Sequence, residues 1–163
     1  MGLMADIEAT RSFQSLSKSL FEFVDGSKVL SKHFTPSASL ASPKSVFAEN
    51  GLGAIEVLSL HFPSNFGGDD KAKVDQTWAE FQKQGLEHSK ELRGVCGGWS
   101  VEADVPEPEG DGKGNALMLL IGWTSVEGHL ENRDTPEFTK AQPLLGATGM
   151  SGLLVVHVKP VTR

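Results

Sequence analysis

Two histidines lie in sequence contexts that suit acid–base chemistry, and His61 is the first. It follows Ser59 at the two-residue spacing of one strand face, while the other face carries the larger apolar side chains. We therefore expect His61 to point toward a cavity or its mouth. There an imidazole with a pKa of about 6.5 could act as a general base on an acidic phenol or an enolisable ketone. A structural histidine bonded to a backbone carbonyl or to water is the alternative.

His129 is the second candidate for acid–base catalysis. It lies four residues before Arg133, so the two side chains share one face of a predicted helix. The surrounding segment, residues 122–138, is crowded with charged side chains. His129 therefore belongs either to the rim of a catalytic cavity or to a solvated or interface face of the helix. Its spacing leaves both interpretations open.

Other chemistry-bearing residues give weaker signals. Trp99 and Trp123 lie on predicted strands and could stack on an aromatic ligand, although core packing is the alternative for each. The five histidines and the single cysteine, Cys96, are scattered, and no two of them have the spacing of a metal-ligand pair. The sequence therefore predicts no metal and no cofactor. It also disfavours a thiolate nucleophile at Cys96, which has no neighbouring histidine.

The elements that must position these residues follow from the hydrophobic periodicity. Alternating or continuous apolar runs predict strands over 52–62, 94–105, 116–123 and 152–160. A helix beginning near Asp69 or Asp70 is predicted between the first two strands, and its apolar stripe is Val74, Trp78, Phe81 and Leu92. Another helix is predicted to begin at Ser125, to break near Thr135 and Pro136, and to continue as a second piece through Leu145.

The element order predicts the fold class. Strand, helix, strand, strand, helix and strand over residues 52–160 indicate an α+β domain of the ferredoxin-like type, with both helices on one face of an antiparallel sheet. Strand 116–123 is apolar on both faces, which is typical of a central strand. Apolar residues on the uncovered face predict a partner sheet and therefore a homodimer.

The N-terminal part is predicted to be an extension of this domain. We expect a helix over 12–24, a strand over 28–34 and a Ser/Pro-rich linker over 36–50. Residues 1–50 then form a helix-strand extension and linker, and residues 51–163 form the ferredoxin-like domain. His33–Pro36 and His157–Pro160 share the pattern His-x-x-Pro, which fits either a partial repeat or chance.

Composition restricts the partners and the compartment. The chain has 163 residues and a net charge of −6, without the basic patches that bind nucleic acid or an anionic membrane. No apolar run reaches the roughly 18 residues of a membrane span, and the N-terminus lacks a secretory signal pattern. We therefore expect a soluble cytoplasmic protein that contacts neither nucleic acid nor membrane.

A family resemblance rests on the segment from the third strand into the second helical region. Its features are Gly122-Trp123, then Ser125-Val126-Glu127-Gly128-His129, then Phe138 followed by Ala141-Gln142. With these, residues 52–160 resemble the dimeric α+β barrel superfamily and, within it, the antibiotic-biosynthesis-monooxygenase-like proteins common in fungi. The resemblance implies two facing sheets that enclose a ligand cavity. The resemblance specifies the fold much better than the function, because the superfamily includes oxygenases, haem-degrading enzymes, cyclases and members with no known activity.

The resemblance also supplies positions to compare. Asn132 and Phe138 stand near the places where cyclases of the superfamily keep a catalytic Tyr and His, and this chain has no Tyr. Gln142 stands where haem-degrading members keep their iron ligand, and it is a poor haem ligand. Cyclase chemistry by that pair and haem chemistry are therefore disfavoured.

Two functional hypotheses remain. The first is a cofactor-independent monooxygenase or cyclase that holds an aromatic or polyketide-like molecule in the barrel, with His61 and His129 as catalytic residues. Its substrate-binding residues would be Trp99, Trp123, Ser59, Phe138 and Asn132. The second is a non-catalytic stress-response or ligand-binding homodimer of the same fold.

Overall fold

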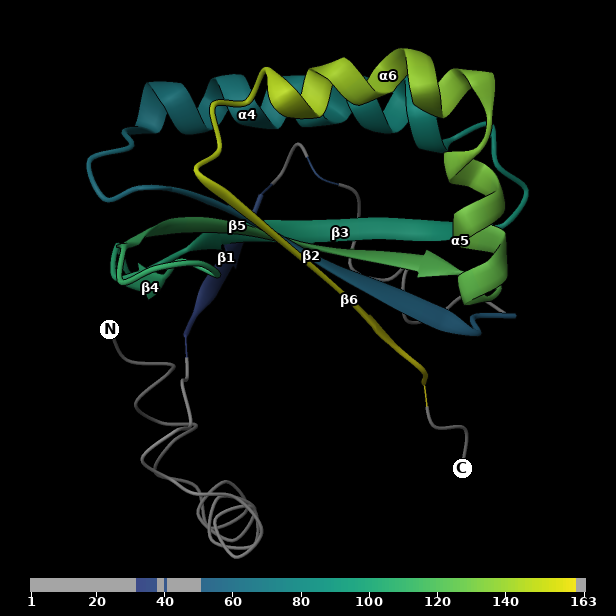
Figure 1. The fold of residues 1–163 in the computed structure, drawn as a ribbon, viewed down its shortest axis with the longest axis horizontal. Coiled ribbons are helices and arrows are strands. Elements are labelled where there is room, and N and C mark those ends of the chain that lie inside the picture. Colours follow the sequence, from purple (N-terminus) through teal and green to yellow (C-terminus); the bar gives the residue numbers. More distant parts are fainter. Residues whose placement is uncertain (1–31, 38–39, 41–50, 161–163) are drawn as a thin grey trace, which may run out of the picture. The chain divides into compact units, whose positions relative to one another are not determined.

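A computed structural model of the chain describes residues 32–37, 40 and 51–160 (Figure 1). The helix expected over 12–24, most of the strand expected over 28–34 and most of the linker expected over 36–50 lie outside the described residues. Within the described part, no helix is long and apolar enough to cross a membrane.

The sheet is antiparallel and has the strand order of a ferredoxin-like fold. Its strands in spatial order are β1 (Phe34–Pro36), β3 (Leu92–Ser100), β5 (Lys113–Trp123), β2 (Ala54–Pro63) and β6 (Gly152–Val158), and the two-residue β4 (Val105–Pro106) pairs with β5. Strands β2, β3, β5 and β6 form the four-stranded core that the sequence predicts, with the apolar β5 between β3 and β2. The α+β ferredoxin-like prediction is confirmed.

The helices form a layer over one face of this sheet (Figure 1). Helix α4 (Gly68–Phe81) continues into a π-helical turn, η2 (Gln82–Leu86), and leads from β2 to β3. Helices α5 (Val126–Arg133) and α6 (Pro136–Gly146) lead from β5 to β6. The Ser125 hydroxyl accepts from the Gly128 amide and caps α5, while Pro136 occupies the first turn of α6, so the predicted break lies between the two helices.

The core lies between the helix layer and the sheet. Leu58, Leu60 and Phe62 of β2 face the helices, because alternate side chains of a strand point to the same side. They pack against Trp78 and Phe81 of α4, and burial of each large side chain contributes about 2 kcal/mol. The opposite sheet face carries a smaller cluster built on Ile55 and Cys96.

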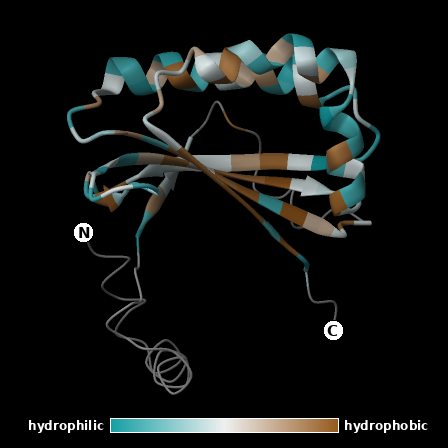
Figure 2. Cartoon of the chain, in the orientation of Figure 1, coloured by the Kyte–Doolittle hydropathy of each residue, from teal (hydrophilic) through white to brown (hydrophobic). Residues whose placement is uncertain are grey.

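Edge strand β6 is the least covered strand of the described sheet. Its exposed apolar residues, between 41% and 47% accessible, lie on both faces of the strand: Leu153, Leu154, Val155, Val156 and Val158. Figure 2 shows this strand as a largely hydrophobic band. The apolar surface that the sequence predicted outside the helix layer therefore exists, and it is most exposed along β6.

Several predicted element boundaries are wrong. Leu92 does not belong to the helical stripe, because the helical segment ends at Leu86 and Leu92 pairs with Trp123 in the sheet. The strand expected to reach Val105 ends at Ser100, and Val101 is 66% exposed. The N-cap of α4 is Gly67, while Asp69 and Asp70 lie in the first turn, where their charges favour the helix dipole.

Candidate functional site

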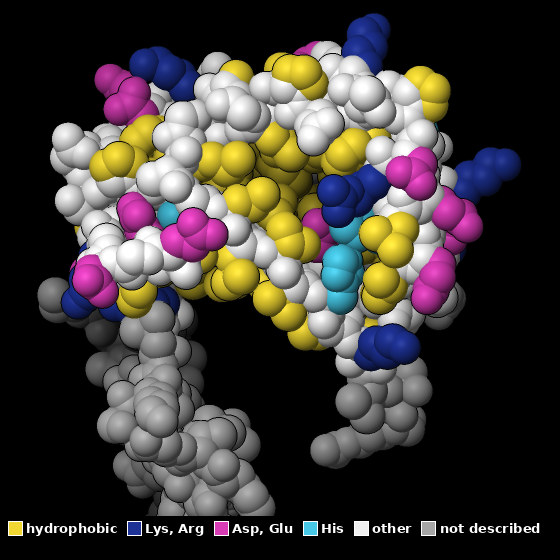
Figure 3. All heavy atoms as spheres, viewed as in Figure 1, with side chains coloured by type: hydrophobic (Ala, Val, Ile, Leu, Met, Phe, Trp, Pro, Cys, Tyr) yellow, Lys and Arg dark blue, Asp and Glu magenta, His cyan; other side chains and the backbone are white. Residues whose placement is uncertain are grey.

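A pocket opens between the helix layer and the β2–β6 side of the sheet. It encloses about 140 Å³. Its apolar lining is Leu58, Trp78, Phe81, Leu86, Ile121, Phe138, Leu145, Leu153 and Val155, and its polar lining is Glu56, His129, Arg133 and Gln142. Figure 3 shows the hollow as a recess with hydrophobic walls beside which histidine, acidic and basic side chains gather. The pocket therefore has an apolar body and one polar side.

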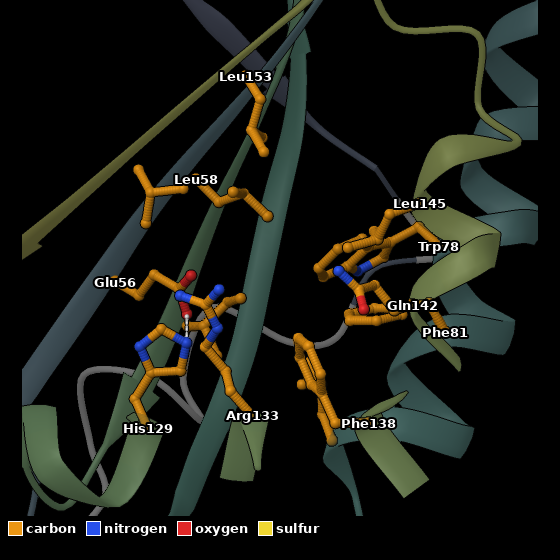
Figure 4. Close-up of a pocket in the computed structure, with 13 residues that line it drawn as sticks. Glu56, Leu58, Trp78, Phe81, His129, Arg133, Phe138, Gln142, Leu145 and Leu153 are labelled. Carbon is orange, nitrogen blue, oxygen red and sulfur yellow. Dashed lines mark ion pairs between the residues drawn. The ribbon is translucent and has the colours of Figure 1, made fainter. Parts of the chain in front are cut away.

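The polar side faces a wall of aromatic rings. Figure 4 shows Glu56, His129 and Arg133 together on one side of the pocket, with Phe138, Phe81 and Trp78 on the other. Phe81 meets Phe138 edge to face, with ring centroids 5.6 Å apart. An aromatic ligand in this space can contact rings with its faces and edges and reach the charged groups with a polar substituent.

Glu56 is a buried carboxyl on the helix-facing side of β2. Its Oε2 accepts from Trp123 Nε1 at 3.1 Å and lies 3.4 Å from His129 Nε2. Burial raises the pKa of Glu56, an effect partly offset by the Trp123 hydrogen bond and by the positive charge of Arg133. The indole thus fixes the orientation of the carboxyl beside the imidazole.

His129 is buried by its neighbours on three elements. Its ring stacks on Trp123 with centroids 5.0 Å apart, and its Nδ1 lies 2.7 Å from His157 Nε2 on β6. Burial, followed by the charges of His157 and Arg133, lowers the pKa of His129 to about 4. At neutral pH His129 is therefore an uncharged imidazole.

The two nitrogens of His129 are not equally engaged. The 2.7 Å contact with His157 has the length of a good hydrogen bond, whereas the 3.4 Å contact with Glu56 is longer than the usual range. When Nδ1 carries the hydrogen and donates to His157, Nε2 holds a free lone pair. In that tautomer Nε2 is the nitrogen that can accept a proton from a ligand.

The structure brings several of the residues predicted for the site to this pocket. His129 and Phe138 line it, and Trp123 lies behind His129 as its stacking partner. Asn132 does not line the pocket, because its side chain is buried and its Nδ2 donates to the Gly85 carbonyl at 3.1 Å. Asn132 thereby ties α5 to the π-helical turn after α4.

The other predicted site residues lie elsewhere. His61 and Ser59 point to the sheet face opposite the helices, as the alternation of β2 predicts, and Ser59 Oγ lies 3.1 Å from His61 Nε2. Burial lowers the pKa of His61. Trp99 packs on the helix side with Phe62, and its Nε1 donates to Asp75 Oδ1 at 2.8 Å. None of these three predicted residues lines the pocket that contains His129.

Sequence reasoning paired His129 with Arg133 on one helix face but missed Glu56 and His157 as parts of the same cluster. A signal existed for Glu56, since it is the acidic member of the strand face that otherwise carries Leu58, Leu60 and Phe62. A charged residue in such a row is buried only where it has partners. His157 becomes adjacent to its partner His129 on α5 only because the chain crosses over from β5 to β6.

Comparisons with known proteins agree on the fold. No protein-family model matches the chain, and no curated protein matches it in sequence. Among solved structures, a candidate monooxygenase from Lactobacillus acidophilus superposes with a TM-score of 0.60 at 9% identity, over 98% of this chain and 66% of that protein. The chain thus spans just under two thirds of that protein's length.

Two further solved structures match more weakly. A dimeric protein of ferredoxin-like fold from Bacteroides fragilis gives a TM-score of 0.46 at 11% identity, covering 66% of this chain and 95% of that one. A Streptomyces coelicolor monooxygenase, solved with nanaomycin D, gives 0.47 at 15% identity, covering 71% and 94%. The strand order and the helix layer give the chain a ferredoxin-like α+β fold, and the Lactobacillus acidophilus structure, described as a candidate monooxygenase, shares this fold.

Proposed function

We propose that the chain is a small enzyme of the monooxygenase type that acts on an aromatic molecule bound in the pocket beneath α5 and α6. The proposal rests on one observation: the cluster of Glu56, His129 and Arg133 lines a pocket whose opposite wall is made of aromatic rings. The fold agrees with this assignment, but a shared fold alone specifies no chemistry.

The size of the pocket restricts the ligand. The pocket volume of about 140 Å³ is close to the ~150 Å³ of an apolar cavity that holds benzene, and below the several hundred Å³ of most drug-sized sites. One ring therefore fits inside. A second ring would extend along Leu153 and Val155, which line the pocket yet remain exposed on β6. The proposed ligand is a phenol or enolisable ketone of one to three fused rings, with its oxygen toward His129.

The proposed reaction begins with proton transfer to His129. Nε2 accepts a proton from the ligand's acidic O–H or C–H group, and the imidazolium then donates to Glu56, whose carboxylate stabilises the new charge. Arg133 lies beside the same pocket and stabilises the ligand anion. The anion supplies the electrons that reduce dioxygen. In an anthrone-type ligand the methylene between two rings becomes a carbonyl: one oxygen atom enters the product, and the other leaves as water with the two methylene hydrogens.

A pair of single substitutions on β6 tests whether the ligand binds in this pocket. Leu153→Trp places an indole in the pocket, whereas Leu154→Trp places it on the opposite sheet face. We expect 1-naphthol binding, followed by calorimetry, to be lost in the first variant and kept in the second. Equal binding in both variants would show that the ligand binds elsewhere.

A second candidate function is ligand binding without catalysis. It is favoured by the hydrogen bonds that the polar groups already make among themselves, Trp123 with Glu56 and His129 with His157. This candidate predicts binding of an anthrone-type ligand, which carries a methylene between two rings, without any oxygen consumption.

The proposed assembly is a homodimer formed through the sheet face that the helices leave uncovered. Leu154, Val156 and Val158 are exposed by 47%, 44% and 43% on this face, and apolar area buried against a second copy is stabilising. We expect Val156→Glu to produce a monomer in light scattering and Val155→Glu, on the pocket face, to leave the dimer intact. A monomeric wild type would contradict this assembly.

A further inference from the structure

We propose that Glu56, His129 and His157 form a binding site for one divalent transition-metal ion, such as Zn²⁺ or Co²⁺, at the polar side of the pocket. One donor atom from each residue lies within 4.8 Å of the other two. The three residues come from β2, α5 and β6, so the backbone of three packed elements fixes the cluster. This proposal goes beyond the proposed function, which uses no metal.

The three donors are near one another but lie farther apart than a bound ion requires. Metal–nitrogen and metal–oxygen bonds of about 2.0–2.2 Å place adjacent ligand atoms roughly 2.8–3.6 Å apart in octahedral or tetrahedral geometry. His129 Nδ1 lies 2.7 Å from His157 Nε2, and the other ring nitrogen, Nε2, lies 3.4 Å from Glu56 Oε2. An ion binds only one nitrogen of a ring, so the relevant spacing is that of one donor atom from each residue, and these three atoms lie within 4.8 Å of one another. Glu56 and His157 are also direct neighbours in the register of β2 and β6. Metal binding therefore requires side-chain rotations that draw the three donors closer around one centre.

The donor set selects the class of metal. Two imidazoles and one carboxylate suit Zn²⁺, Co²⁺, Ni²⁺ or Fe²⁺, whereas Mg²⁺ and Ca²⁺ require mostly oxygen ligands. Three protein ligands leave at least one coordination position free, and the pocket is the space beside it. An oxygen atom of a bound small molecule or a water molecule would fill that position.

Neighbouring groups have opposite effects on the affinity of the cluster for a metal ion. Trp123 donates to Glu56 Oε2 and stacks on the His129 ring, which holds two of the three ligands in place. Arg133 carries a positive charge beside Glu56 and opposes a cation. Its side chain is exposed, so water screens much of that repulsion. The net effect is a site of moderate affinity that depends on all three ligands.

Metal binding and the proposed function have separate consequences. A metal bound through His129 removes a nitrogen that the cofactor-free reaction requires as a base, so Zn²⁺ would inhibit that reaction and a chelator would restore it. Metal binding itself is measured without any turnover. The metal site can therefore fail while the proposed function stands, and the reverse is equally possible.

The experiment titrates the EDTA-treated, dialysed full chain with Co²⁺ and follows the visible d–d absorption, with Zn²⁺ calorimetry as a second measurement. We expect one ion per chain. Affinity should fall at least ~10-fold in His157→Ala and Glu56→Gln. His88→Ala removes an imidazole outside the cluster and should bind as the wild type does. Circular dichroism verifies the fold of each variant, and His157→Gln replaces His157→Ala if the latter is unfolded.

Two results would overturn the metal site. One is the absence of both Co²⁺ and Zn²⁺ binding to the wild type, which would leave the two imidazoles as a simple hydrogen-bonded pair. The other is metal binding that the His157 and Glu56 substitutions leave unchanged, or that His88→Ala weakens equally.

Discussion

The imidazole nitrogens His129 Nδ1 and His157 Nε2 lie 2.7 Å apart, although the residues are 28 positions apart in sequence and on different elements. His129 belongs to α5 and His157 to β6, the edge strand that is otherwise poorly covered. This contact joins the end of the helix layer to the edge of the sheet beside the pocket. It also determines which nitrogen of His129 remains available to a ligand.

The first prediction concerns the pH dependence of stability in metal-free protein. The folded-state pKa of His129 is lowered from 6.5 to about 4, by burial first and then by His157 on β6 and Arg133 on α5. A lowered pKa means that the stabilising contribution is present above pH 6.5 and is lost as the pH falls toward 4. Glu56 on β2 has a raised pKa, so its contribution to stability has the opposite pH dependence. It is present at low pH and is lost as the pH rises above 4.5.

Urea unfolding of the wild type and of His129→Gln at several pH values separates the contribution of His129 to stability from that of Glu56. The stability advantage of the wild type over the variant should shrink as the pH is lowered from 6.5 to 4, because only the wild type carries the His129 titration. A constant difference between the two proteins over this range would show that His129 is not buried as described.

The second prediction concerns the N-terminus of α5. Ser125 Oγ accepts from the Gly128 amide at 3.0 Å, and Ser125→Ala leaves that donor unsatisfied. We expect a loss of about 1 kcal/mol in the free energy of unfolding, measured in urea. Ser64→Ala, in the exposed turn after β2, is the control and should change stability little. An equal effect of the two substitutions would contradict the capping role.

The third prediction concerns the attachment of β1 to the sheet. A methyl group on Gly98 would overlap the Thr35 carbonyl oxygen, so Gly98→Ala should separate β1 from β3. The amides of Ser37 and Val101 bond across these segments at 3.0 and 2.8 Å, and we expect their hydrogen exchange to accelerate. Gly68→Ala, with no atom within 4 Å of the added methyl, should leave exchange unchanged. Unchanged protection in Gly98→Ala would mean that β1 is not held in this register.

The fold was predictable from sequence because its strongest signals are local. Alternation predicts a strand over residues 52–62, and the continuous apolar run predicts a central strand over 116–123. Two helix starts are indicated by Ser125 and Pro136. The errors at Leu92 and after Ser100 occur where the pattern changes without a Gly or Pro signal. Leu92 continues a helical spacing but belongs to a strand, because pairing with β5 outweighs the local periodicity.

The candidate site was only partly predictable. His129 and Phe138 were predicted for the site, and the i,i+4 spacing put Arg133 on the His129 face of its helix. Glu56 and His157 join them through tertiary contacts that no local spacing records. His61 lies with Ser59 on the sheet face away from the helices, as the alternation of β2 predicts, and therefore outside this pocket. The direction of a side chain follows from alternation, whereas the location of a cavity depends on how α5 and α6 pack over the sheet.

Oxygen consumption with an anthrone-type substrate tests the central claim most directly. In the presence of a chelator, we predict that the wild type consumes oxygen and forms the ketone. His129→Gln should lower the rate at least ~100-fold, the usual contribution of a general base. His61→Ala, on the opposite sheet face, should keep the wild-type rate. The account is contradicted if the wild type consumes no oxygen, or if His61→Ala abolishes the reaction while His129→Gln leaves it intact.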